Sequence, residues 1–392
     1  MRRLAMAGLA ITAIVVLGAT ATRDVHGLSL VVRAADLEGP FRRVVDFDTV
    51  PIVERIVAAR TRSGTLRARV YAPRGASRQT VLLVSGLHAA GIDEPRLVVL
   101  ARELAKSRVT VVTPEIDELA RFEITARLTD RIEDTAAWLA GDRGLAPSGR
   151  IGLMGISFSG GLSIVAAGRP SLHDRLLYVF SFGWHDDLRR VLEYFCTGPE
   201  REALGAGRGE PALALPVRAA HDYGVAIVLL TVAERLVPAD QIAPLRDAVR
   251  RFLWASYLDG VDKPQAEREF AALRAVARQL PEPAATLLDE VNNRDVEHLG
   301  HRLLPFIGYY VDEPALSPAR SPHPAAPVFL LHGKDDNVIP AAESQRMAAR
   351  LRGQVPVRLL LTDLISHAAA DQPARVVDVF RLAGFWGDLL AR

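Results

Sequence analysis

The sequence contains little that would support disulfide, redox or nucleotide chemistry. Its 392 residues include a single cysteine, Cys196, which cannot form an intramolecular disulfide. The apolar neighbours of Cys196 favour a buried small side chain over a thiol nucleophile. Neither G-x-G-x-x-G nor G-x-x-x-x-G-K-[ST] occurs, so we predict no cofactor.

Lysine is also scarce, and arginine supplies nearly all of the 48 basic side chains. The formal net charge is only +2, and the arginines alternate with Asp and Glu without forming a basic block. This pattern predicts no nucleic-acid partner.

Only one apolar run is long enough to matter for targeting. It extends from Leu4 to about Ala21, follows Arg2 and Arg3, and ends in small residues. These are the parts of a secretory signal, and the run is also long enough for an uncleaved membrane anchor. We therefore expect residues 1–27 to direct export, with a periplasmic, secreted or membrane-anchored product; a buried core helix is the alternative.

Short apolar strands alternate with helical patterns through most of the chain. This alternation predicts an α/β fold with a doubly wound, mostly parallel sheet covered by helices on both faces. The strict alternation at residues 66–71 is typical of a half-solvated edge strand. The expected strands are 52–59, 66–71, 80–84, 109–112, 151–154, 176–182, 328–331 and 357–361.

The alternation stops after Gly183, and helical patterns fill the stretch to about Pro324. We predict a core over residues 28–183, a helical cap insertion over residues 184–325, and the rest of the core over residues 326–392.

The segment from Ile151 to Gly161 predicts where the chemistry is located. A buried strand leads to Gly155, turns sharply at Ser157 and continues as a helix, as in a nucleophile elbow. Ser159 stands where the strict G-x-S-x-G pattern has glycine, and it is the alternative nucleophile. A purely structural strand–helix turn is a third interpretation.

The last two predicted strands are followed by an acid and a base. Asp336 comes just after the strand at 328–331, with Asp335 as the competing choice, and His367 follows the strand at 357–361. Because the carboxyl ends of parallel strands meet at one edge, Ser157, Asp336 and His367 are expected to converge there.

These residues resemble the α/β-hydrolase superfamily, over about Ile52–Gly183 and Ala326–Leu390. The resemblance implies that Ser157 attacks an acyl carbonyl, that His367 carries the proton, and that Asp336 orients His367. The backbone N–H of Phe158 is expected to form one half of an oxyanion hole. Leu87 is our first choice for the other half, and His88 is the second.

Other polar motifs point less clearly to chemistry. Glu297–His301 has histidines at i and i+3 but no third ligand, so we predict no metal site. His221–Tyr223 and His185–Asp187 are interpreted as polar lid or hinge residues.

We therefore expect a cofactor-independent serine hydrolase that cleaves an ester or related acyl bond. Its partner would be a small acyl substrate, partly apolar because the cap is rich in Leu, Val, Phe and Ala. Membrane association through the N-terminal segment is a further expectation. The alternatives are acyl transfer by the same triad and a non-catalytic exported binding protein with this fold.

Overall fold

The computed structural model describes residues 22–34, 46, 49–198, 219–308, 313–365 and 376–392. Its centre is an eight-stranded sheet with the order β1-β2-β4-β3-β5-β6-β7-β8. The strands are β1 (Ile52–Thr61), β2 (Gly64–Pro73), β3 (Gln79–Val84), β4 (Val109–Pro114), β5 (Ile151–Ile156), β6 (Leu176–Phe182), β7 (Val328–Gly333) and β8 (Val357–Thr362).

The six strands β3 to β8 all run parallel to one another, and β2 is antiparallel to both of its neighbours. The prediction that residues 66–71 form an edge strand is wrong, because β2 pairs with β1 on one side and β4 on the other. Its alternation has another cause. Arg67 and Arg69 project from one face of β2 and pair with Glu115 and Asp93, so this face is partly solvated although the strand is internal.

Helices cover both faces of the sheet, as predicted. Leu128 of α5 (Ala126–Gly141) and Leu162 of α6 (Phe158–Ala167) belong to the apolar core on one face. On the other face, Leu97 of α3 (Pro95–Lys106) and Phe385 of α16 (Val376–Leu390) belong to a second core. The prediction of a doubly wound α/β fold is thus confirmed.

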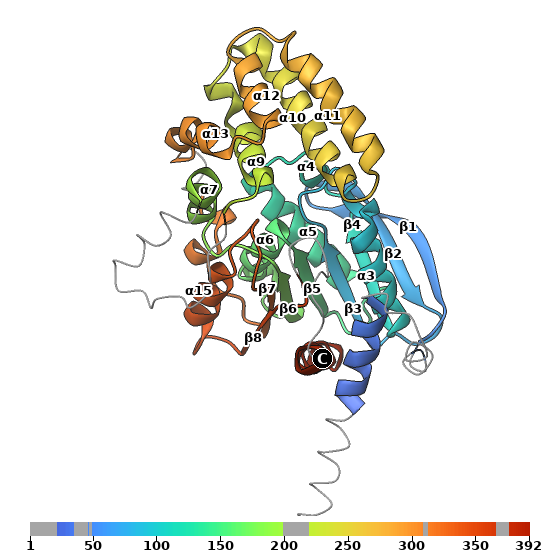
Figure 1. Cartoon of the computed structure of the whole chain (residues 1–392). Coiled ribbons are helices and arrows are strands. Elements are labelled where there is room, and N and C mark those ends of the chain that lie inside the picture. Colours follow the sequence, from blue (N-terminus) through green and yellow to red (C-terminus); the bar gives the residue numbers. More distant parts are fainter. Residues whose placement is uncertain (1–21, 35–45, 47–48, 199–218, 309–312, 366–375) are drawn as a thin grey trace, which may run out of the picture.

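Helices of the insertion gather above the sheet in Figure 1. The insertion enters through α7 (Leu188–Thr197) and returns to the sheet through β7. No separate helix was predicted at residues 296–303, near the end of the insertion. The cap helices are α9 (Asp222–Val232), α10 (Ala239–Asp259), α11 (Lys263–Ala277), α12 (Ala284–Asn292) and the unpredicted α13 (Val296–Leu303).

A helix over residues 22–34 packs on α16, and the two lie side by side in Figure 1. The backbones approach so closely that a Cβ at Gly27 would lie 1.8 Å from the carbonyl oxygen of Ala383. The boundary predicted at residue 27 falls within this helix. The apolar run at residues 4–21 lies outside the described residues, and within them no helix is long and apolar enough to span a membrane.

Candidate active site

Ser157 occupies the sharp turn between β5 and α6. Its φ of 53° and ψ of −131° are an unusual backbone conformation for a residue with a side chain. The turn is held on both sides, because the N–H of Ser157 donates to the carbonyl of Phe182 at 2.6 Å and that of Gly160 donates to the carbonyl of Ser157 at 2.8 Å. The residue is half-buried. The strained turn is therefore maintained at the carboxyl end of a central strand.

The turn requires small residues because strand and helix nearly touch. A Cβ at Gly155 would lie 2.4 Å from the carbonyl oxygen of Ser159 and 2.7 Å from the Cα of Gly160. Both contacts are with backbone, which cannot move aside as a flexible side chain could. This close approach accounts for the glycine two positions before Ser157.

Ser159 has a structural environment different from that of Ser157. Its side chain is fully buried, and its hydroxyl accepts a hydrogen bond from the N–H of Ile156 at 3.0 Å. Its own proton faces the carbonyl oxygens of Ile156 at 2.9 Å and Val84 at 3.1 Å. The hydroxyl thus links the elbow to the end of β3, and this use accounts for the departure from glycine at this position.

Asp336 lies in the turn after β7 and is 5% exposed. One oxygen of its carboxylate, Oδ1, accepts hydrogen bonds from the N–H groups of Val338 and Ile339, each at 2.9 Å. Asp335, the competing choice, is half-buried. The chain therefore fixes the orientation of Asp336 by its own turn.

Sequence reasoning missed His332, which lies beneath Asp336. The imidazole is fully buried, and its Nε2 is 2.9 Å from the carbonyl oxygen of Ile339 and 3.2 Å from Oδ2 of Asp336. A carbonyl can only accept, so Nε2 carries the proton; Nδ1 contacts the hydroxyl of Ser344. The signal was the i, i+4 spacing of His332 and Asp336 around a turn.

The predicted base, His367, lies outside the described residues. The strand that leads to it, β8, pairs with β7 in parallel from Val328–Val357 to Gly333–Thr362. The carboxyl end of β8 therefore lies beside that of β7, where Asp336 follows.

The loop over residues 85–90, which we call the oxyanion loop, runs against the elbow. Its strand, β3, is paired directly with β5, and a Cβ at Gly86 would lie 3.2 Å from the Cβ of Ser157. The N–H of Leu87 has no acceptor among the described residues. Phe158 is the first residue of α6, so its N–H has no acceptor within the helix. Of the two predicted donors, Phe158 follows Ser157 directly in the chain, and Leu87 follows Gly86, which lies against Ser157.

His88, the second choice for the oxyanion hole, has its imidazole in an unusual environment. Its Nδ1 accepts from the N–H of Ala90 at 3.1 Å, so the proton lies on Nε2. Nε2 is buried without a hydrogen-bond acceptor among the described residues. Burial lowers the pKa of His88, and the neutral ring packs edge-to-face with Tyr257 of α10 at 4.6 Å. His88 is therefore a neutral donor at the junction of core and cap.

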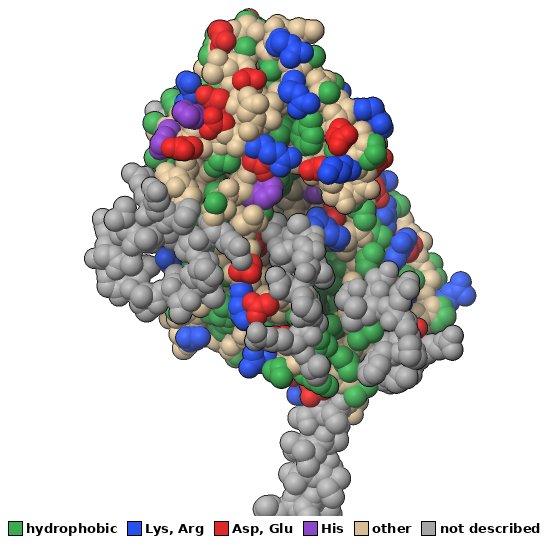
Figure 2. All heavy atoms as spheres, in the orientation of Figure 1, with side chains coloured by type: hydrophobic (Ala, Val, Ile, Leu, Met, Phe, Trp, Pro, Cys, Tyr) green, Lys and Arg blue, Asp and Glu red, His purple; other side chains and the backbone are tan. Residues whose placement is uncertain are grey.

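The predicted hinge residues anchor the cap to the core. His185 is fully buried, its Nε2 is 2.8 Å from the carbonyl oxygen of Leu316, and its ring stacks on Phe158 at 4.9 Å. Burial lowers the pKa of His185 and keeps the ring neutral. The N–H groups of Asp186 and Asp187 donate to buried Glu343 at 2.9 and 3.0 Å. Figure 2 shows further histidine atoms, in purple, where cap and core meet.

His221 and Asp222 lie at the start of α9, the next described helix of the cap after α7. His221 caps the helix, and Asp222 is its first residue. The N–H of His221 donates to the carbonyl of Asn337 at 3.1 Å, directly beside Asp336. Nδ1 of His221 lies 2.6 Å from Asp222 and 3.1 Å from the N–H of Tyr223. It cannot donate and accept at once, and we favour donation to the charged carboxylate, which is the stronger bond. Burial opposes ionisation of Asp222, but this bond and nearby Arg294 lower its pKa.

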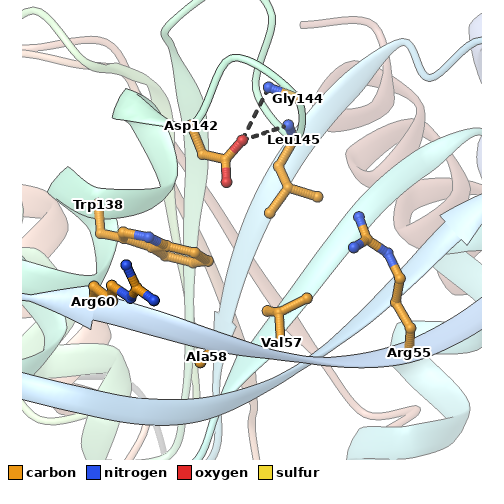
Figure 3. Close-up of a pocket in the computed structure, with 8 residues that line it drawn as sticks. All are labelled: Arg55, Val57, Ala58, Arg60, Trp138, Asp142, Gly144 and Leu145. Carbon is orange, nitrogen blue, oxygen red and sulfur yellow. Dashed lines mark hydrogen bonds between the residues drawn. The ribbon is translucent and has the colours of Figure 1, made fainter.

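Other candidate sites carry no comparable arrangement. A cavity of about 330 Å³ lies between β1 and α5 (Figure 3), but its lining holds no nucleophile. Its acid, Asp142, accepts from the N–H groups of Gly144 and Leu145. Burial raises the pKa of the Cys196 thiol to about 12. Within the described residues, no group of three or more metal-ligating side chains is present.

Comparisons with known proteins give likenesses at low sequence identity. No family model and no curated protein matches the chain. An esterase from Pyrobaculum calidifontis is 15% identical, with 88% of this chain and 87% of that chain covered and a TM-score of 0.44. A dienelactone hydrolase from Anabaena variabilis is 14% identical, with 86% and 96% covered and a TM-score of 0.42.

An acylaminoacyl peptidase from Pyrococcus horikoshii is 12% identical, with a TM-score of 0.45; the match covers 88% of this chain and 42% of the peptidase. The α/β-hydrolase type of fold therefore rests on features of this chain itself. They are the parallel sheet with an antiparallel second strand, the sharp turn at Ser157 and the turn after β7 that contains Asp336, which we call the acid turn.

Proposed function

We propose that this chain is a serine hydrolase that cleaves a carboxylic ester or related acyl bond through an acyl-enzyme. Ser157 Oγ attacks the acyl carbonyl carbon while His367 takes its proton. The tetrahedral intermediate then collapses, the bond to the leaving group breaks, and His367 returns the proton to the leaving oxygen. Asp336 holds the imidazole and stabilises its charged form.

The second half-reaction releases the acid. Water gives a proton to His367 and attacks the acyl-enzyme, and the second tetrahedral intermediate expels Ser157, which recovers that proton. In both halves the carbonyl oxygen becomes an oxyanion, and the N–H groups of Phe158 and Leu87 are the donors proposed to bind it. No cofactor is required for any of these steps.

The observation that supports this proposal most strongly is the environment of Ser157. The chain maintains a positive φ at a serine, at the carboxyl end of a central strand, with the oxyanion loop against its Cβ. A turn that served structure alone would be relieved by glycine at this position, since glycine adopts positive φ without strain. The strain is explained if the hydroxyl must be presented to a substrate.

The cap supports an apolar substrate portion. The helix α9, which contacts the oxyanion loop through Tyr223, is almost entirely apolar after its first turn, and most of its side chains are buried. Part of this apolar surface also packs on the core. The preference for an apolar acyl chain is therefore itself a proposal, and esters of graded acyl chain length test it.

The experiment is a panel of acyl esters of graded chain length, assayed with the wild type and Ser157→Ala in parallel. We expect hydrolysis that Ser157→Ala reduces by about 10⁴–10⁶-fold. Adding competing alcohols distinguishes hydrolysis from acyl transfer, because transfer yields new esters. Hydrolysis that Ser157→Ala leaves intact, or a folded wild type that turns over no ester of the panel, would contradict the proposal.

We also propose that the N-terminal segment directs export, on the basis of the apolar run at residues 4–21 after Arg2 and Arg3. Fractionation of expressing cells and N-terminal sequencing of the product test this proposal. A full-length product found only in the cytosol would contradict it.

A further inference from the structure

The cap contacts the oxyanion loop at two consecutive residues. The phenol of Tyr223, in the first turn of α9, donates to the carbonyl of Leu87 at 2.7 Å. The ring of Tyr257, on α10, packs edge-to-face against the imidazole of His88. Two cap helices therefore hold a loop that belongs to the core.

The loop makes few other hydrogen bonds near Ser157, although the side chain of Leu87 is buried in the apolar core. Its own hydrogen bonds lie at the far end, where the N–H groups of Ala90 and Gly91 donate to His88 at 3.1 and 2.8 Å. Within the described residues, the bond from Tyr223 is the one hydrogen bond that Leu87 makes. Gly86 has no side chain to restrict rotation of its peptide. The hydrogen bond from the cap therefore restrains the Leu87–His88 peptide, which directly follows the peptide that carries the N–H of Leu87.

Tyr223 is itself well positioned for this role. Its ring packs edge-to-face with Phe122 at 6.3 Å. The start of its helix is tied to the acid turn through the bond from the N–H of His221 to the carbonyl of Asn337. Burial raises the pKa of Tyr223, so the phenol stays protonated and can donate throughout the neutral pH range.

We propose that Tyr223 is a positioning residue that preorganises the oxyanion hole, so that the cap completes the active site as well as covering it. This inference rests on the proposed function. An oxyanion hole is effective only if its donors are already oriented before charge develops. Loss of the Tyr223 hydroxyl leaves the ring in place but frees the Leu87 carbonyl to turn.

The test compares Tyr223→Phe with Tyr178→Phe as a matched control. The hydroxyl of Tyr178 is buried in β6 with no hydrogen-bond partner among the described residues, so its removal should leave turnover unchanged. We expect Tyr223→Phe to lower kcat by about 10- to 100-fold with little change in KM, since misplacement of catalytic groups acts on the transition state. Its melting temperature should stay close to that of the wild type.

A trifluoromethyl ketone with the preferred acyl chain provides a readout that a structural role would not move. Its adduct with Ser157 carries an oxyanion, so its affinity should fall by the same factor as kcat/KM. Wild-type kcat in Tyr223→Phe, or a loss confined to KM, would overturn the inference alone. A wild type without ester hydrolysis or adduct formation would overturn the proposed function and this inference together.

Discussion

The hydroxyl of Ser159 lies 3.1 Å from the carbonyl oxygen of Val84, across the gap between the elbow and the end of β3. The second serine of the elbow therefore links the start of α6 to the end of β3, and its hydroxyl is committed to this contact. A hydrogen bond of this kind within a buried site contributes to stability rather than to reactivity.

This relationship predicts opposite behaviour for the two serines. Ser159→Ala should unfold about 1–3 kcal/mol more easily, because buried backbone groups lose their partner, and should still react with a fluorophosphonate probe. Ser157→Ala should have nearly wild-type stability and no reaction. Urea unfolding and gel-based labelling measure both properties. Loss of labelling in Ser159→Ala, with the variant folded, would assign the nucleophile to Ser159.

Substitution of Asp335 and of Asp336, the two acids after β7, should have different effects on kcat. Asp336→Asn keeps an oxygen that can accept from Val338 and Ile339 but removes the charge that stabilises an imidazolium, so kcat should fall by about 10⁴-fold. Asp335→Asn should leave kcat close to that of the wild type. Steady-state kinetics on the same ester decides, and the reverse result would show that the acid was assigned to the wrong residue.

The junction of cap and core should weaken in acid. Burial opposes ionisation of Glu343, but its pairing with Arg190 outweighs burial and lowers the pKa of Glu343 below its ordinary value of 4.5. A lowered folded-state pKa means that the stabilisation is present above the unfolded-state pKa and is lost as pH falls through the folded-state value.

Glu343→Gln should therefore melt well below the wild type at pH 7, and the difference should shrink as the pH falls below about 4.5. Differential scanning calorimetry from pH 3 to 8 measures the two melting temperatures. A difference that stays constant over this range would show that Glu343 contributes through packing and not through its charge.

The helix over residues 22–34 should be an integral part of the folded body. Arg33 is 2% exposed and pairs with buried Glu103 at 2.7 Å. Arg33→Met should cost about 3 kcal/mol, because it leaves a buried carboxylate with one partner fewer. The control is Arg23→Met, because Arg23 is exposed and lies 3.9 Å from its partner Asp388, with an expected cost below about 1 kcal/mol. Equal effects in urea unfolding would contradict the buried anchor.

The strands could be predicted from the sequence because their apolar runs are short and bounded by turns. Segments such as Thr80–Val84 and Ile151–Met154 lie within β3 and β5 as observed. The place of β2 inside the sheet could not be predicted, because alternation reports a solvated face and an edge alike.

Long-range contacts account for the remaining differences. The helix over residues 22–34 is held by the close backbone approach of Gly27 to Ala383 and by the ion pair of Arg33 with Glu103. Both partners are far away in the sequence. The bond between Tyr223 and Leu87 spans 136 positions, and no local pattern marks it. His332 was predictable in principle, since its spacing from Asp336 is local.

The central claim is that Ser157 is the nucleophile, and the most direct measurement is the site of its covalent adduct. After reaction with a fluorophosphonate and cleavage with trypsin, Ser157 and Ser159 lie in one peptide, residues 151–175, because Pro170 protects the bond after Arg169, and fragment ions distinguish them. The account predicts the phosphonyl group on Ser157 in the wild type and no adduct in Ser157→Ala. An adduct on Ser159, or a folded wild-type protein that does not react, would contradict it.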